Sequence, residues 1–194
     1  MRGFVKVLVF VLIGGNAWAA DNLTVRAVKG VAYTETGEML KKKSVLRWGD
    51  VVHVAPAGQL DIVSADEISM RIYGPSAVTL RQTKKTKSSW LDLAFGRMIA
   101  AFKPGTAAAI STRTSVAGVR GTVVYVEESD AHKGYTCVCE GRVEHTHRKN
   151  RDLKQLVETQ HHSAIYATDT TLESAGMFNH TDDDVSAVKA LIGR

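Results

Sequence analysis

From Leu23 to about Ala167, apolar and polar residues alternate in short runs that are separated by turn residues. The alternation is clearest at Ile68, Met70 and Ile72, where apolar side chains occupy every second position. A period of two places one row of side chains on each face of a strand, so each run predicts a half-buried β-strand. Many short strands with recurring turns are typical of a β-sandwich, a barrel or a β-solenoid. We therefore expect a mainly β fold of stacked antiparallel strands, forming one domain over residues 21–167.

Two glycines mark the stretch Thr112–Val126, which predicts two β-branched strands that meet at a bend. Gly118 and Gly121 interrupt otherwise strand-prone sequence, where glycine usually indicates a bulge or the close approach of another backbone. We therefore expect tight packing around this bend.

The segment Trp90–Ala100 allows two interpretations, a strand or a helix. Its apolar residues first recur with a period of two, and Gly96 follows them. Both features favour a strand.

The stretch Asn179–Arg194 is the one clear helix in the sequence. Thr181 is a suitable N-cap, and three aspartates follow it in the first turn, where they complement the positive end of the helix dipole. Apolar residues at helical spacing form a stripe, and Gly193 suits the C′ position. We expect residues 168–194 to form a tail whose short C-terminal helix docks on the β domain, because so short a helix is unstable alone.

Residues 1–20 have the features of a secretory signal peptide. Arg2 and Lys6 precede a short apolar run, and small residues surround Ala19 and Ala20, where we expect cleavage. An uncleaved membrane anchor is the alternative, but the apolar run is much shorter than the roughly 20 residues that a spanning helix needs. No later stretch is apolar enough to span a membrane. The sequence thus predicts a periplasmic protein without a transmembrane segment in its mature chain.

The formal net charge is +5, of which Arg2 and Lys6 of the predicted signal peptide supply two charges. Lysines cluster at 41–43 and at 84, 85 and 87. Such clusters either bind an anionic partner or keep loops and sheet edges soluble. The second interpretation is favoured because no aromatic residues are interleaved with the lysines, as they usually are in nucleic-acid grooves. Export also argues against a nucleic-acid partner.

Cys137 and Cys139, the only two cysteines, lie in a predicted strand and follow residue 130, as do six of the seven histidines. Side chains two positions apart leave a strand on the same face, with Cα atoms about 6.6 Å apart. That geometry fits an intrachain disulfide poorly. In an oxidising compartment, the thiols must therefore be buried, bridged between chains or bound to a metal.

Metal binding is the most specific of these possibilities, because two thiolates with one or two imidazoles suit zinc, and soft thiolates also suit copper(I). His161 and His162 lie on a neighbouring predicted strand, where a regular backbone lets at most one of them face the cysteines. His180 is the natural further ligand, just before the helix. His145 and His147 share one strand face and form an alternative pair.

Two other interpretations compete with a metal site. Cysteines on an inward strand face are often small core residues, which would leave a structural module of the envelope. A thiol enzyme or redox protein would need an exposed thiol with a depressed pKa. The sequence contains no c-type haem motif, no Gly-x-Ser-x-Gly elbow and no phosphate-binding glycine loop. We therefore expect a protein that is not an enzyme.

Three segments, taken together and in order, resemble the periplasmic sensor domain of the FecR family. They are Leu46-Arg47-Trp48-Gly49-Asp50, then the run from Ile110 through Val119-Arg120-Gly121-Thr122-Val123, and then Cys139-Glu140-Gly141-Arg142-Val143. The resemblance covers roughly Val25 to Ala167, and its middle segment is the most specific.

The FecR resemblance implies a sensing or interaction module that receives a signal from a periplasmic or outer-membrane protein partner. In members with the full layout, a cytoplasmic anti-sigma segment and a transmembrane helix precede the domain. This chain instead begins with a predicted signal peptide, so the resemblance leaves open whether it takes part in the control of a sigma factor. The pair Cys137 and Cys139 and the histidine-rich tail are additions that the family pattern does not require.

Overall fold

The computed structural model describes residues 22–65, 67–83 and 88–194. The predicted signal peptide and the lysines at 84, 85 and 87 lie outside these residues. The described part folds into one sheet of fourteen strands and a single helix, α1 (Asp182–Ala190). No helix in this part of the chain is long and apolar enough to cross a membrane. The strands are β1 (Leu23–Lys29), β2 (Ala32–Thr34), β3 (Val45–Leu46), β4 (Val51–Val54), β5 (Gln59–Ser64), β6 (Ile68–Gln82), β7 (Ser89–Phe102), β8 (Ala107–Ser111), β9 (Ser115–Arg120), β10 (Val123–Asp130), β11 (Lys133–His147), β12 (Lys154–Thr159), β13 (Ser163–Thr168) and β14 (Leu172–Ala175).

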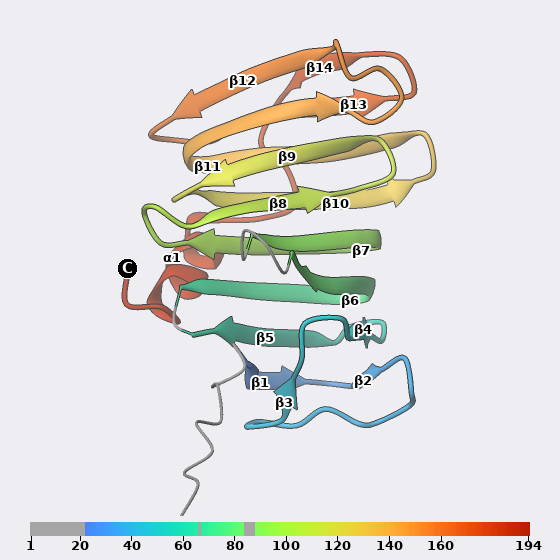
Figure 1. Ribbon diagram of the computed structural model, residues 1–194, viewed down its shortest axis with the longest axis vertical. Helices are drawn as coiled ribbons and strands as arrows, with labels where there is room; N and C mark the ends of the chain where they lie inside the picture. The colour runs from blue at the N-terminus through green and yellow to red at the C-terminus, as the bar shows by residue number, and fades with distance from the viewer. Residues whose placement is uncertain (1–21, 66, 84–87) are drawn as a thin grey trace, which may run out of the picture.

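The strands stack one above another in approximate chain order, from β1 and β3 at one end to β12 and β14 at the other (Figure 1). All pairings are antiparallel except that of β7 with β8, which is parallel. The expectation of a mainly β fold of stacked antiparallel strands is therefore confirmed. The boundary expected at residue 167 falls within the last residues of β13, and β13 pairs with β14 across it.

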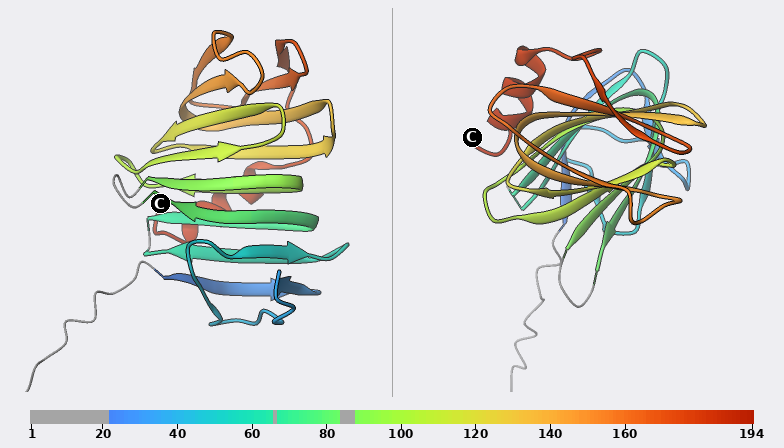
Figure 2. Two further views of the ribbon diagram at one scale, coloured as in Figure 1. Left: turned by 45° about the vertical axis from the view of Figure 1, so that its right-hand side comes forward. Right: turned by 90° about the horizontal axis from the view of Figure 1, so that it is seen from above.

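Three long strands, β6, β7 and β11, change partners along their length and so fold the sheet over on itself. The first half of β7 pairs with β8, and its second half pairs with β10. Gly96 lies between these halves with φ +96°, and a Cβ there would collide with Ser76 and with the backbone of Pro75. The chain needs glycine at this bend because both the left-handed backbone and the close packing exclude a side chain. Figure 2 shows the resulting closed outline from above.

The fold has two hydrophobic clusters, one on each side of the sheet. The main core lies between the layers and draws residues from nearly every strand, among them Leu60, Ile72 and Leu93. A second, smaller cluster lies between the sheet and α1, and it includes Val188 and Ile192 of the C-terminal region. The helix therefore covers the outer face of the sheet beside β6 and β7, as both views in Figure 2 show.

The C-terminal helix has the ends that the sequence predicts. Thr181 is the N-cap: its hydroxyl accepts a hydrogen bond from the Asp184 N–H, and the Asp184 carboxylate accepts one from the Thr181 N–H. At the other end, Gly193 has φ +69°, and Arg194 N–H donates to the carbonyl of Lys189. This is the Schellman arrangement that favours glycine at C′. The helix docks on the sheet, as expected.

The glycine-marked stretch folds as two strands, β9 and β10, joined at Gly121, which has φ +66°. A Cβ at Gly121 would lie 2.8 Å from Cα of Pro104, so the predicted close approach occurs here. Gly118 differs, because a Cβ there would make only an ordinary contact of 3.6 Å with the carbonyl of Glu144. The segment Trp90–Ala100 lies within β7, so the strand interpretation of it is correct.

Candidate metal centre

Strand β11 presents Cys137 and Cys139 on the outer face of the sheet, as period-two geometry requires. Their exposed fractions are 0% and 3%, and both are free thiols. Along this part of the strand, β10 pairs on one side and β13 on the other. The two sulfur atoms therefore project from the middle of a hydrogen-bonded sheet, where the backbone holds them firmly.

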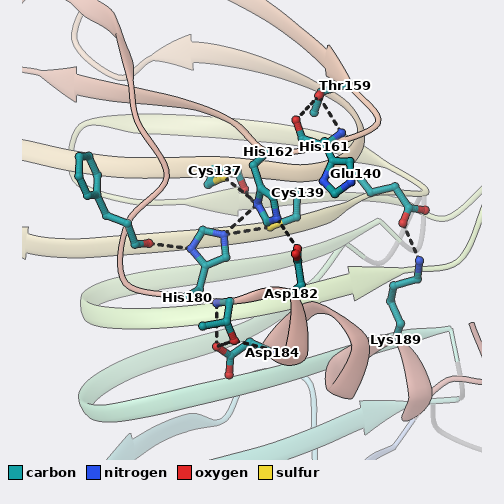
Figure 3. Close-up of polar contacts among 12 residues, drawn as sticks. Cys137, Cys139, Glu140, Thr159, His161, His162, His180, Asp182, Asp184 and Lys189 are labelled. Carbon is teal, nitrogen blue, oxygen red and sulfur yellow. Dashed lines mark hydrogen bonds and ion pairs between the residues drawn. The ribbon is translucent and has the colours of Figure 1, made fainter.

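Two histidines from later in the chain meet the cysteines (Figure 3). His162 lies immediately before β13, and its backbone N–H donates to the carbonyl of Cys139. His180 immediately precedes the N-cap of α1 and is buried. The ligand atoms of Cys137, Cys139, His162 and His180, which we call the Cys2His2 cluster, all lie within 4.8 Å of one another.

The separations within the Cys2His2 cluster match the edges of a tetrahedron around one metal ion. Zinc bonds of about 2.3 Å to sulfur and about 2.0 Å to nitrogen imply edges of about 3.5 Å between S and N and about 3.3 Å between the two N atoms. Cys137 Sγ lies 3.6 Å from His162 Nδ1, and Cys139 Sγ lies 3.4 Å from His180 Nε2. The two nitrogens are 3.3 Å apart. The donor atoms are therefore spaced for direct coordination.

The outer hydrogen bonds of both imidazoles direct a lone pair into the cluster. His180 Nδ1 lies 2.7 Å from the carbonyl oxygen of Phe178, which can only accept, so Nδ1 carries the proton. His162 Nε2 lies 2.8 Å from a carboxylate oxygen of Asp182 and donates to it. In neutral rings the facing nitrogens, His162 Nδ1 and His180 Nε2, are then unprotonated. Two lone pairs at 3.3 Å repel unless a cation or a proton lies between them.

Aromatic residues of the outer face support the cluster. The ring of Tyr125 stacks on that of His180 at 4.4 Å between centroids and 11° between planes. The hydroxyl of Tyr135 donates to the carbonyl of Gly176 and accepts from the N–H of Phe178. These contacts fix the segment that carries His180 across the sheet. Hydrogen bonds to the remaining ring nitrogen are the usual second-shell support of metal-bound histidines.

The protonation of the four groups is coupled. The hydrogen bond from Cys139, together with those from the two histidines, lowers the pKa of Cys137, whereas the pKa of Cys139 is raised by its bond to Cys137 and by burial. Burial alone would lower the pKa of His162, but hydrogen bonds to Asp182 and Cys137 outweigh it and raise that pKa. Without an ion, the cluster therefore favours a thiolate at Cys137.

His161 lies outside the Cys2His2 cluster. It is exposed, and its ring is tilted against His162 with centroids 5.9 Å apart. Only His162 of this pair reaches the sulfur atoms, and both residues lie in the turn between β12 and β13 rather than in the strand that the sequence suggested. His161, His162 and Asp182 do form a second, more exposed group of possible ligands. The 2.8 Å separation between His162 Nε2 and Asp182 is a hydrogen bond, so we assign Asp182 to the second shell.

The alternative pair, His145 and His147, lies on the opposite face of β11 from the cysteines. In a regular strand, residues five positions apart lie on opposite faces. Val138 and Val143 nevertheless belong to the same core cluster, because Gly141, with φ +104°, interrupts the alternation of faces between them. His145 and His147 follow Val143 with a period of two and therefore face that core. His147 Nε2 bonds to the carbonyl of Thr168, and neither histidine belongs to a possible ligand group among the described residues.

The sequence analysis missed Asp182 and Tyr125 as partners of the cluster. The capping pattern at Thr181 assigns Asp182 to the first turn of the helix, which explains the acidic residue without any contact to a histidine. Tyr125 lies opposite Cys137 in the β10–β11 register. That register becomes visible in a sequence only when the pairing of the two strands is known.

A cleft of about 960 Å³ lies away from the Cys2His2 cluster. Arg148 lines it and is held by Ser111 and by the carbonyl of Thr112. Arg81 lines it too and is paired with Asp92. Arg148 and Arg81 therefore already have protein partners.

Comparison with known proteins supports the fold. Two crystal structures of a candidate anti-sigma factor from Parabacteroides distasonis ATCC 8503, at 1.65 and 2.50 Å resolution, superpose with TM-scores of 0.55 and 0.54 at 13% sequence identity. They cover 71% of this chain, which spans 63% and 62% of theirs. No curated protein sequence matches the chain at a significant level. At this identity the likeness shows the fold alone.

The family assignment comes from a family model described as FecR protein, which matches residues 50–144. The matched segment runs from β4 to β11 and includes both cysteines, the bend at Gly96 and the β9–β10 junction. The structural neighbours have the same kind of fold. The chain therefore contains a FecR domain within residues 50–144.

Proposed function

We propose that this protein is a signalling module of the bacterial envelope that binds a protein partner and holds one metal ion in its Cys2His2 cluster. The FecR domain supports the signalling role. The name of the structural neighbours, anti-sigma factor, supports a protein partner. The predicted signal peptide and two cysteines without a disulfide fit an exported chain whose thiols need protection.

One observation carries the metal proposal: three separations between donor atoms of 3.3, 3.4 and 3.6 Å, from residues that are up to 43 positions apart. Four protein ligands complete a tetrahedron and leave no open position for a substrate. Such a site has a structural or sensory role. We assign zinc first because two thiolates and two imidazoles in a tetrahedron are typical of it, with copper(I) as the alternative.

The test is elemental analysis of protein purified without a histidine tag, before and after incubation with zinc and with copper(I). We expect about one ion per chain in the wild type and almost none in the Cys137→Ser/Cys139→Ser double variant, because both thiolates are ligands. Cobalt(II) substitution would add the visible absorption of a tetrahedral thiolate site, which disappears on zinc addition.

His161→Ala is the matched control, since His161 neighbours a ligand but is exposed outside the cluster. It should bind the ion as the wild type does, whereas His162→Ala should bind it much more weakly. A wild-type protein that binds no more zinc or copper(I) than the folded double variant would contradict the proposal.

A second function has one observation in its favour. Cys137 Sγ lies 3.6 Å from His162 Nδ1, and His162 Nε2 lies 2.8 Å from a carboxylate oxygen of Asp182. This is the arrangement of a thiol nucleophile that is activated by a base, which a carboxylate in turn orients. Burial argues against it, because Cys137 has no exposed surface. Rapid alkylation of metal-free protein by iodoacetamide at neutral pH would favour this thiol chemistry, and inert thiols would leave the metal site.

A further inference from the structure

Residues 176–194, which we call the C-terminal segment, cross the outer face of the sheet and end in α1. Val188 and Ile192 are buried in the second hydrophobic cluster. The same cluster includes Val63 of β5 and Ile99 and Ala101 of β7. Val185 and Leu191 pack against this cluster but are only partly buried, so the fully buried apolar contact of the helix is small.

Polar contacts fasten the helix to the sheet along its length. The hydroxyl of Ser69 donates to the carbonyl of Val188, and that of Tyr73 donates to Asp184. Glu140 accepts from both Lys189 and Arg194. These side chains are partly exposed, so each ion pair contributes little to stability.

The Cys2His2 cluster lies where the C-terminal segment enters its helix. The segment supplies one ligand, His180, directly before the N-cap, and one second-shell group, Asp182, in the first turn. The sheet supplies the other three ligands, from β11 and from the turn before β13. An ion bonded to all four groups would cross-link the segment to two strands.

Loss of the ion would remove this cross-link and leave the facing nitrogens of His162 and His180 only 3.3 Å apart. A helix of nine residues is hardly stable without tertiary contacts. Segments with few buried apolar contacts are also the ones that open locally, well below the free energy of global unfolding. The C-terminal segment should therefore respond to the ion more than any strand does.

We propose that the ion acts as a latch: when it is bound, α1 is docked, and when it is removed, residues 176–194 leave the sheet and uncover the apolar face beneath. This inference rests on the proposed metal site and adds its regulation. Val63, Ile99 and Tyr125 lie on the face that becomes accessible. A FecR module would thereby convert metal occupancy into a change of surface.

Hydrogen exchange followed by mass spectrometry, on the full chain with zinc and after chelation, tests the latch. Zinc removal should speed exchange of the α1 amides roughly tenfold or more, while β8 and β9 stay protected. Zinc binding with unchanged α1 exchange would overturn the latch and leave the metal site in place. If zinc does not bind at all, the metal site and the latch both fail.

Val188→Ala tests the same coupling from the other side, because it weakens docking without touching a ligand. If zinc binding favours helix docking, helix docking must favour zinc binding to the same extent. The variant, whose helix is docked for less of the time, should therefore bind zinc less tightly than the wild type. Ser186→Ala, on the exposed side of the same helix, is the control and should bind zinc as the wild type does. Equal zinc affinity of Val188→Ala and wild type, with α1 exchange faster in the variant, would contradict the latch.

Discussion

His145 lies in the interior of the sheet with neither ring nitrogen hydrogen-bonded to a protein group. Burial lowers its pKa to about 4 from the ordinary value of 6.5. The folded protein therefore keeps this ring neutral. Below pH 6.5 the unfolded chain takes up a proton that the folded state accepts only near pH 4, so stability falls as the pH is lowered through this window.

We expect His145→Leu to remove that loss. Between pH 7 and pH 4, the variant should gain about 3 kcal/mol in unfolding free energy relative to its parent. Urea unfolding at several pH values measures this difference. The Cys137→Ser/Cys139→Ser background serves as parent, so that protonation of the metal ligands does not contribute. His161→Ala, at an exposed position, is the control and should show no such gain. If the unfolding free energy of His145→Leu depends on pH in the same way as that of its parent, His145 is not the cause of the loss.

The residues of the Cys2His2 cluster could be predicted only in part from the sequence. The spacing of Cys137 and Cys139 fixes their common face wherever the strand lies, because the period of a strand is local. The choice between His161 and His162 depends on where β13 begins against β11, which no local signal sets. His145 and His147 were misplaced as alternative ligands because Gly141 reverses the alternation between them and the cysteines.

Bends within single strands organise the elements of this fold. β6, β7 and β11 are 14 to 15 residues long and serve two sets of partners each. Gly96 allows this in β7, with a left-handed backbone packed directly against Ser76. Gly37, in the connection after β2, has a similar φ of +85° but no atom near its missing Cβ.

Comparing Gly96→Ala with Gly37→Ala separates backbone strain from packing. Both substitutions force alanine into positive φ, which costs about 1 kcal/mol. Only at Gly96 must the new methyl group also displace neighbouring backbone, so we expect destabilisation of about 3 kcal/mol or more there. Chemical denaturation of both variants gives the comparison. Equal losses would show that the bend at Gly96 tolerates a side chain.

Local signals also explain which elements were predictable. The helix carries its own cap, first-turn aspartates and terminal glycine, and the strands carry period-two patterns, so both kinds of element are visible in the sequence. The order of pairing is not, because β11 meets its chain neighbours β10 and β12 and also β9 and β13, whose residues lie further away in the sequence. The parallel pairing of β7 with β8 is likewise set by the fold as a whole.

Across the whole molecule, the sheet and the C-terminal segment are unequal partners. All fourteen strands and the main core lie before Gly176, and the segment adds one helix on the outer face. The sheet thus has its own core, whereas α1 depends on the sheet. This asymmetry makes the helix the movable part of the structure.

A chain that ends at Gly176 should therefore keep its β structure and lose its metal. Circular dichroism should show the strand signal of the full chain, because no strand is removed. Zinc affinity should fall at least about tenfold with the loss of His180, one of four ligands. Increased binding of the dye ANS would report the uncovered apolar face. An unfolded product would contradict the independence of the sheet.

The boundary of the family match divides the Cys2His2 cluster in two. Both cysteines lie within residues 50–144, whereas His162 and His180 lie beyond them. The family-matched part of the chain thus carries the sulfur atoms, and the part beyond it carries the nitrogens. In the proposed metal site, a single ion would tie these two parts of the sequence together at one point.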